Sequence, residues 1–116
     1  MVRAVVCREL GPPERLRLET SARVPLGAGM VRVAIRAAGI NFPDILMAAG
    51  EYQLKPDLPF TPGVEAAGDV IEIDDEATDF TIGDRVIVRM RHGAYTDEAV
   101  VAPAQLTPVS SVAVAM

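Results

Sequence analysis

One stretch of the chain combines a short helix, a proline-rich loop and a glycine-flanked acid: AGINFPDILMAAGEYQLKPDLPFTPGVEAAG, residues 38–68. Asn41 is a residue type that favours the position before a helix, and Pro43 suits a first helical turn. The apolar run that follows predicts one short helix over about residues 43–49. Gly50 is expected to end this helix in a left-handed conformation.

The loop after the predicted helix contains three prolines, which stiffen it and remove backbone donors: Pro56, Pro59 and Pro62. It also contains Tyr52 and ends in Gly63-Val64-Glu65. Functional residues are often carried by loops that are rigid without being regular. The stretch is therefore expected to hold a site.

The remainder of the chain carries strand patterns, either alternating or β-branched. The expected strands are residues 2–7, 15–20, 31–36, 70–73, 85–90 and 95–101. The last two are expected to form a hairpin across His92 and Gly93. Short strands at near-regular spacing, with one short helix, predict a mainly β fold built as a closed or partly closed antiparallel barrel.

Composition limits the class of protein. The 116 residues suffice for one domain, and half of them are apolar, as in a globular protein. The net charge is −5 and the arginines are scattered among acids, so no nucleic-acid partner is expected. A single cysteine, Cys7, fits a reducing compartment and is expected to be a buried apolar residue. No signal peptide or membrane-spanning run is recognised, so a cytoplasmic location and no membrane partner are expected.

Five motifs occur in order along the chain: Asn41-Phe42-Pro43-Asp44, Gly50-x-Tyr52, Leu58-Pro59-Phe60-x-Pro62-Gly63-x-Glu65-x-x-Gly68, Asp79-Phe80-x-x-Gly83-Asp84-Arg85-Val86 and Gly93-Ala94-Tyr95. Together they resemble the N-terminal, GroES-like catalytic domain of the zinc-free medium-chain dehydrogenases/reductases, a family that includes quinone oxidoreductases and zeta-crystallin-type enone reductases. The resemblance covers residues 1–109, and residues 110–116 read as a divergent or truncated tail. It implies a GroES-like, partly closed antiparallel barrel.

The resemblance also implies a reaction: hydride transfer from NADPH to a quinone or an α,β-unsaturated carbonyl compound. In this family Asn41 would lie near the nicotinamide ribose, whereas the residue alone suggests a helix N-cap. Asp44 either supports Asn41 in a polar network beside the nicotinamide or compensates the helix dipole. Phe60 and Leu46 are expected in the core or the pocket wall.

Two further residues have alternative readings. Tyr52 either donates its hydroxyl to a substrate carbonyl, in place of a Lewis-acid metal, or acts as an aromatic lid on the barrel. Glu65 is expected to pair with Arg89 or Arg91 and to hold the floor of the cleft rather than to act in catalysis.

No metal site is expected. Zinc needs about four ligands, and the chain offers one cysteine and one histidine, far apart in sequence. The zinc-dependent relatives place cysteine where Asn41 stands and histidine where Val64 stands. Neither Asn41 nor Val64 is a plausible zinc ligand.

No dinucleotide-binding motif is found either. Such a site needs Gly-x-Gly-x-x-Gly between a strand and a helix, and residues 27–29, the one Gly-x-Gly, precede a strand. No Rossmann domain is therefore expected within these residues. NADP(H) is expected to bind weakly to the chain alone, which is expected to be inactive by itself.

An alternative hypothesis keeps the predicted fold but assigns the chain no catalytic activity. A free-standing barrel would serve as a binding or interaction module, or be a truncated remnant, and its exposed edge would favour a homodimer. A GroES-type co-chaperonin subunit is a third reading. The site-like character of residues 41–65 argues against it.

Overall fold

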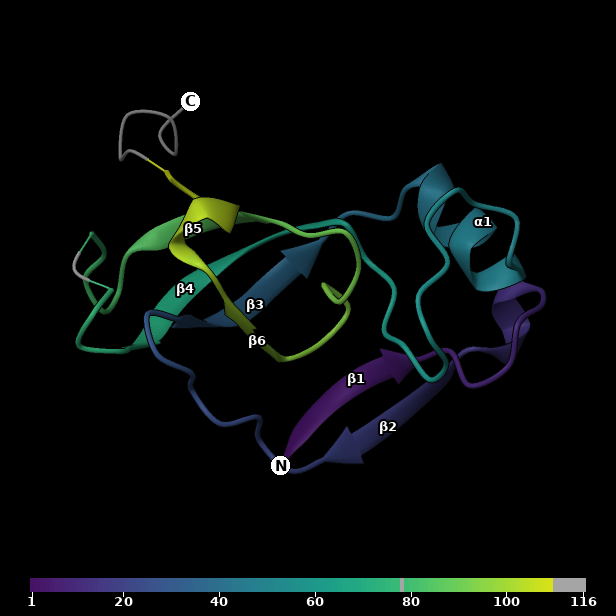
Figure 1. Ribbon diagram of the computed structural model, residues 1–116, viewed down its shortest axis with the longest axis horizontal. Helices are drawn as coiled ribbons and strands as arrows, with labels where there is room; N and C mark the ends of the chain where they lie inside the picture. Colours follow the sequence, from purple (N-terminus) through teal and green to yellow (C-terminus); the bar gives the residue numbers. More distant parts are fainter. Residues whose placement is uncertain (78, 110–116) are drawn as a thin grey trace.

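The computed structural model describes residues 1–77 and 79–109, which form two antiparallel sheets, one α-helix and two short 3₁₀ helices (Figure 1). The strands are β1 (Val2–Val6), β2 (Arg17–Ser21), β3 (Val31–Ala38), β4 (Glu65–Ile73), β5 (Arg85–Arg89), β6 (Glu98–Val101) and β7 (Leu106–Pro108). The helix α1 spans Phe42–Ala49, and the 3₁₀ helices span Pro13–Arg15 and Pro103–Gln105. The predicted short helix is confirmed. No described helix is long and apolar enough to cross a membrane.

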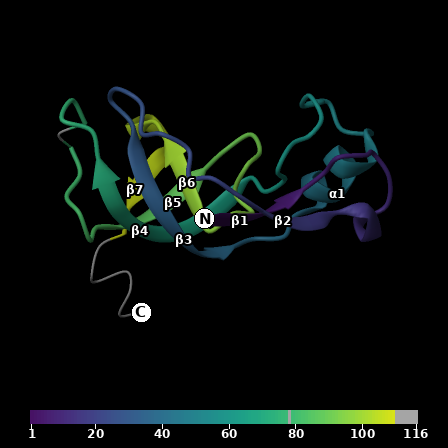
Figure 2. The same cartoon turned by 90° about the horizontal axis from the view of Figure 1, so that it is seen from below.

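The strands divide into a two-stranded sheet, β1-β2, and a five-stranded sheet in the order β6-β3-β4-β5-β7. In Figures 1 and 2 the five-stranded sheet occupies one end of the molecule and α1 the other, with the β1-β2 pair extending between them. The predicted mainly β, GroES-like fold is confirmed. The described strands do not close into a complete barrel.

The predicted hairpin of residues 85–90 and 95–101 is wrong. Strand β5 pairs with β4 and β7, whereas β6 pairs with β3. The connecting residues bond to other segments: the Ala94 N–H donates to the Gly63 carbonyl and the Tyr95 N–H to the Pro62 carbonyl. The Tyr95 carbonyl accepts from Val5. Because these backbone groups are satisfied elsewhere, the segment turns away from β5 and leads to the far edge of the sheet.

The main core lies within the five-stranded sheet and consists largely of valines. In β5 the inward residues Val86 and Val88 are fully buried and alternate with exposed neighbours. Their partners include Val31, Val33, Val70 and Val101. A second buried cluster under α1 comprises Cys7, Met47, Ala48 and Phe60, so the expected burial of Cys7 is confirmed.

Strand β4 starts five residues earlier than its apolar pattern indicated, because its first half is built from small residues. Gly68 lies so close to β3 that a Cβ built on it would stand 2.1 Å from the carbonyl oxygen of Ala34. The register against β3 shifts between Ile35 and Ala37. This close approach brings the beginning of β4 beside the segment that leads into α1.

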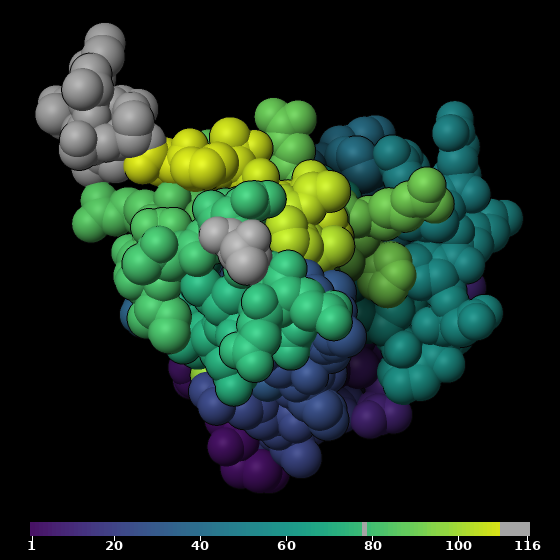
Figure 3. Space-filling model, turned by 60° about the vertical axis from the view of Figure 1, so that its left-hand side comes forward, coloured from purple at the N-terminus to yellow at the C-terminus, as the bar shows by residue number. Residues whose placement is uncertain are grey.

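Strand β3 carries one buried charge on its other face. Arg32 is only 3% exposed, and its guanidinium lies 2.7 Å from Glu72, 3.7 Å from Glu98 and 2.6 Å from the Val24 carbonyl oxygen. The loop before β3 also bonds to the residues after β4, because the Gly29 N–H donates to Asp74 at 2.8 Å. In Figure 3 the blue surface of the segment that leads into β3 lies directly against the teal-green surface of the segment after β4. The partnered charge thus fixes this loop on the sheet.

Contacts between β1 and the segment before β6 join the two sheets. The Arg3 side chain lies 3.2 Å from Asp97, and the Asp97 N–H donates to the Arg3 carbonyl at 2.9 Å. The guanidinium of Arg3 lowers the pKa of Asp97 below its usual value. A second connection runs from Cys7 to Phe60, whose backbone groups exchange two hydrogen bonds. These contacts hold the β1-β2 pair beside α1.

Candidate functional site

The carboxylate of Asp44 is the centre of a hydrogen-bond network at the start of α1. Asp44 is 5% exposed. Its Oδ2 accepts from the backbone N–H of Asn41 at 2.9 Å, and its Oδ1 accepts from the backbone N–H of Gly63 at 3.2 Å. The negative charge also lies in the first turn of the helix, where the dipole favours it. Asp44 therefore supports Asn41 and also lies where the helix dipole favours its charge, while its place beside a nicotinamide stays a prediction.

Asn41 occupies the N-cap position of α1, with extended backbone angles. Its side-chain Nδ2 donates to Glu65 Oε1 at 3.1 Å, at the start of β4. An amide carries two N–H groups, and the second makes no hydrogen bond within residues 1–77 and 79–109. Asn41 is half-buried, so this N–H can reach a ligand.

The pairing of Glu65 with Arg89 or Arg91 is wrong, because no ion pair joins them in the described residues. Arg89 is the register partner of Glu65 across β4 and β5. The carboxylate instead extends toward Gly39, where an added Cβ would stand 2.6 Å from Oε1. The absence of a side chain at Gly39 thus lets Glu65 reach Asn41.

Tyr95 completes the network and was not among the predicted site residues. Its hydroxyl donates to Asp44 Oδ2 at 2.6 Å and lies 3.0 Å from the Gly39 carbonyl oxygen. Burial, and then the hydrogen bond and charge of Asp44 and the charge of Glu65, raise the pKa of Tyr95 well above its ordinary value. The hydroxyl consequently remains a donor at neutral pH. The motif Gly93-Ala94-Tyr95 marks this position in the sequence, but nothing in the sequence indicates that Tyr95 bonds to Asp44.

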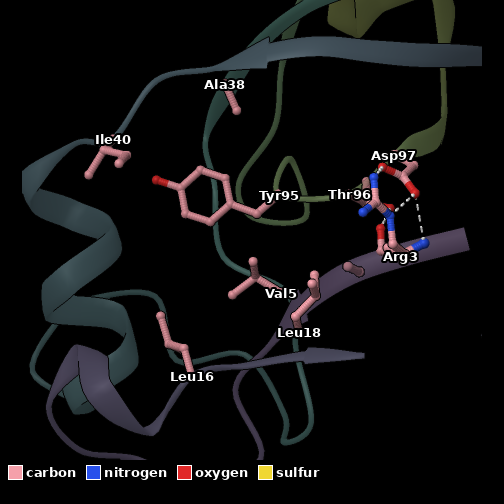
Figure 4. A pocket seen from close by; sticks show the side chains of 10 residues that line it. Arg3, Val5, Leu16, Leu18, Ala38, Ile40, Tyr95, Thr96 and Asp97 are labelled. Atoms are coloured by element: carbon pink, nitrogen blue, oxygen red, sulfur yellow. Dashed lines mark hydrogen bonds and ion pairs between the residues drawn. The ribbon is translucent and has the colours of Figure 1, made fainter. Parts of the chain in front are cut away.

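Two apolar hollows flank the Asp44–Tyr95 pair. The larger, of about 550 Å³, lies between the β1-β2 pair and the end of β3, and its lining includes Val5, Leu18, Ile40 and Tyr95 (Figure 4). The smaller, of about 170 Å³, shares Ile40 and Tyr95 and reaches Asp44. Leu18 is 67% exposed and Ile40 81% exposed. An apolar surface therefore adjoins the buried carboxylate.

Tyr52 lies apart from this network, in a hollow of about 390 Å³ that is lined by Pro43, Tyr52, Gln53, Leu54, Val64, Met90 and Arg91. Its ring packs against the second buried cluster, and its hydroxyl makes no hydrogen bond in the part of the chain that is described. The packing agrees with an aromatic lid, while the hydroxyl is available as a donor. The first turn of α1 connects the two regions, since Pro43 lines this hollow and Asn41 caps the helix.

The two predicted wall residues differ in burial. Phe60 is 5% exposed and belongs to the second buried cluster, where its ring meets His92 edge to face with centroids 5.9 Å apart. Leu46 is half-buried on α1 and lines none of the hollows named above. Phe60 is thus a core residue that supports the loop behind Tyr52.

Within the described residues, no group of three or more histidine, cysteine, aspartate or glutamate side chains is arranged to hold a metal ion. At the two positions where zinc-dependent relatives carry cysteine and histidine, this chain places an amide and an isopropyl group, Asn41 and Val64. Neither side chain has the donor chemistry that zinc prefers.

Residues 27–111 match the family model of the alcohol dehydrogenase GroES-like domain. The chain belongs to this family. The match covers most of the sequence and includes α1, the proline-rich loop and the strands of the larger sheet.

The chain is also similar to several proteins named as quinone oxidoreductases or quinone oxidoreductase-like. The chain is 43% identical over 110 residues to quinone oxidoreductase-like protein 2 homolog of Nematostella vectensis, covering 94% of the chain and 30% of that relative. The crystal structure of Pseudomonas syringae quinone oxidoreductase superposes with a TM-score of 0.88 and 33% identity, covering 96% of the chain and 34% of that protein. A mycobacterial structure in complex with NADPH has a TM-score of 0.85 and 28% identity, with coverages of 97% and 35%. The predicted GroES-like domain and its resemblance to quinone oxidoreductases are confirmed, and the chain spans about a third of these proteins. Zinc independence stays a prediction.

Proposed function

We propose that this domain forms the substrate side of an NADPH-dependent quinone or enone oxidoreductase that works without zinc. The observation that carries the proposal is the network around Asp44. It holds Asn41 at the start of α1, between the apolar hollow beside Tyr95 and the hollow that contains Tyr52. Family membership and the similarity to quinone oxidoreductases support the same reaction.

NADPH fits the donor set of the site. Asn41 has an amide N–H without a partner among the described residues, and a ribose hydroxyl or carboxamide oxygen can accept from it. When bound, the reduced nicotinamide supplies the hydride. The domain's contribution is to orient the two reactants and to exclude water from the space between them.

Stabilisation of negative charge on the substrate oxygen falls to hydrogen-bond donors. The hydroxyl of Tyr52 lines a hollow large enough for a quinone ring and is free to donate. The proposed role of Tyr52 is to donate to the carbonyl oxygen as its charge develops. Removal of one such donor typically costs about 10²–10³ in turnover.

Asp44 and Tyr95 act on Asn41 rather than on the substrate. The carboxylate holds the backbone of Asn41 and of Gly63, while the protonated Tyr95 hydroxyl fixes the carboxylate. Glu65 fixes the side-chain amide. The proposed role of this network is to keep the amide in one orientation, which is the main requirement of a preorganised site.

Two further features belong to the proposal. Zinc independence is supported by the side chains of Asn41 and Val64, which offer no ligand. A cytoplasmic location is supported by the single cysteine, Cys7, which is buried and reduced.

Duroquinone titrated into the isotopically labelled 116-residue chain, followed by two-dimensional NMR, tests the proposal. Shifts are expected at Tyr52, Val64 and Met90, which line the same hollow. Tyr52→Phe removes the hydroxyl and keeps the ring, so binding should weaken about threefold, the value of one neutral hydrogen bond. Leu58→Ala, an exposed change in the same loop, serves as control. Shifts confined to Leu18 and Ile40, or none at all, would contradict the proposal.

A further inference from the structure

Within the described residues, four of the ten arginines lack a carboxylate partner although the chain is acidic: Arg17, which bonds to the backbone carbonyls of Glu14 and Leu16, and Arg85, Arg89 and Arg91. Six arginines lie within ion-pair distance of a carboxylate: Arg3, Arg8, Arg15, Arg23, Arg32 and Arg36. Among the described residues, the side chains of Arg85, Arg89 and Arg91 make neither an ion pair nor a hydrogen bond. All three lie on β5 or directly after it. Acids outnumber bases, 16 to 11, so a shortage of acids does not explain this.

Two of these arginines face adjoining hollows. A hollow of about 560 Å³ is lined by Arg89, Met90, Arg91, His92 and Gln105. Met90 and Arg91 also line the hollow of Tyr52, so the two spaces are neighbours. Arg85 lines neither.

Among residues 1–77 and 79–109, no carboxylate lines either space. Other hollows of the molecule differ: the one that contains Arg3 also contains Asp97, and the one that contains Arg32 also contains Glu98. Glu65, opposite Arg89 in the strand register, is engaged by Asn41 instead. The positive charge beside the Tyr52 hollow is therefore not neutralised from within the described part of the domain.

Guanidinium groups bind carboxylate, sulfonate and phosphate oxygens through paired N–H donors. Here two guanidinium side chains adjoin a wall made of an aromatic ring and the apolar side chains of Leu54, Val64 and Met90. A ligand that matches both the apolar wall and the guanidinium groups has a flat, conjugated ring at one end and an anionic group at the other.

We infer that the site selects quinones or enones that carry an anionic group, with the ring in the Tyr52 hollow and the anion against Arg89 and Arg91. The inference rests on the proposed function and names the substrate class within it. A nucleotide phosphate shares the anionic chemistry. We assign the anion-binding position beside Arg89 and Arg91 to the substrate, because Arg91 also lines the hollow that holds Tyr52.

The test compares two stable quinones of similar shape, anthraquinone-2-sulfonate and the neutral 2-(hydroxymethyl)anthraquinone, by NMR titration of the full 116-residue chain. The sulfonate should bind about five- to tenfold more tightly at low salt, as expected for one or two exposed charge-assisted contacts. The difference should shrink as salt is added. The largest additional shifts should come from Arg89 and Arg91.

The variants separate the site from the general charge of the molecule. The double variant Arg89→Gln/Arg91→Gln should bind both quinones equally. Arg85→Gln removes the same charge from the same strand, outside both hollows, and should retain the preference. All three positions are exposed, so the variants should fold.

Three outcomes would overturn the inference. Equal affinity of the native chain for the two quinones is the first, and an Arg85→Gln variant that loses the preference as fully as the double variant is the second. The third is competitive displacement of the sulfonate by adenosine 2′,5′-bisphosphate, which assigns the position to a nucleotide phosphate. If the neutral quinone binds in the Tyr52 hollow while the preference is absent, only this inference fails. If neither quinone binds there, the proposed function fails with it.

Discussion

The hydroxyl of Tyr95 donates to a carboxylate that is itself almost fully buried, at 2.6 Å. Asp44 receives two other donors, both from the backbone, at 2.9 and 3.2 Å. Loss of the hydroxyl leaves one Asp44 oxygen with fewer donors in a place where water has little access. A buried charge that loses a donor is costly, whereas an exposed hydroxyl costs little to remove.

Tyr95→Phe is expected to lower the free energy of unfolding by about 1–2 kcal/mol, as for a hydrogen bond to a charged group in a half-buried position. Burial and Asp44 raise the pKa of Tyr95 above its ordinary value of 10.0. The folded state therefore holds this proton more tightly than the unfolded state. The contribution of the protonated Tyr95 hydroxyl to folding stability is therefore complete below about pH 10 and is lost as the pH rises further.

Denaturation with urea between pH 7 and pH 11 measures both effects. The native chain should lose stability above about pH 10 more steeply than Tyr95→Phe. Tyr52→Phe is the matched control, because the Tyr52 hydroxyl makes no hydrogen bond in the described residues, and it should change stability by less than about 0.5 kcal/mol. Equal effects of the two variants at pH 7 would show that the Asp44 contact contributes nothing.

Sequence identified single residues better than it identified their partners. Asn41 and Asp44 are predictable because they stand before and within the first turn of a helix, where local chemistry favours these residue types. Opposite charges predict an arginine partner for Glu65, but the space beside Gly39 lets its carboxylate bond to Asn41 instead. Tyr95 lies 51 positions from Asp44, and no local pattern encodes a contact at that separation.

At the scale of elements, α1 was the most predictable and the hairpin the least. Asn41, Pro43 and Gly50 mark the helix ends by their own conformational preferences. Alternating patterns placed β5 and β6 closely, but alternation carries no information about which strand is the neighbour. The pairing was decided by the backbone groups of residues 94–97, which bond to β1 and to the end of the proline-rich loop.

Substitution of Gly68 tests how closely the backbones of β3 and β4 pack against each other. Its backbone has no positive φ, so strain in the chain is not the issue. An added Cβ would stand 2.1 Å from the Ala34 carbonyl oxygen and 2.9 Å from Cγ1 of Val33. The backbone atom is unable to move without breaking the strand pairing. Gly68→Ala is therefore expected to cost at least about 2 kcal/mol, at the upper part of the range for overpacking.

Thermal unfolding by circular dichroism measures this cost. The control is Gly27→Ala, another glycine without a positive φ, whose added Cβ would meet only the flexible Met30 side chain at 3.3 Å. That variant should change the free energy of unfolding by less than about 0.5 kcal/mol. A Gly68→Ala variant as stable as the control would show that the strands separate without cost at this point.

At the scale of the whole molecule, the site is assembled where the two sheets meet. Tyr95 follows the turn after β5, Asp44 lies on α1, and the hollow beside them is walled by β1 and β2. Sequence predicted the fold from short strands and one helix, and the family from five ordered motifs. The junction of the sheets was not predictable, because it rests on contacts such as Arg3 with Asp97, 94 residues apart.

The 116-residue chain alone should not oxidise NADPH with benzoquinone as acceptor. Its sequence contains no Gly-x-Gly-x-x-Gly between a strand and a helix, the arrangement whose backbone amides bind a pyrophosphate. In the proposed arrangement the domain would offer the nicotinamide end one amide N–H and an apolar hollow, and such contacts would hold only a small part of a dinucleotide. Without the remaining contacts the cofactor is not retained long enough, or in a fixed enough orientation, for hydride transfer.

Absorbance at 340 nm with excess NADPH and benzoquinone, corrected for the reaction without protein, measures the rate. The same chain in the NMR titration should still bind duroquinone, because the Tyr52 hollow lies within the described residues. Quinone binding without turnover is the combination expected of a substrate-side domain. Turnover that is abolished by Asn41→Ala would show instead that these residues suffice to hold the nicotinamide. The proposal that the domain forms only the substrate side of the site would then be wrong.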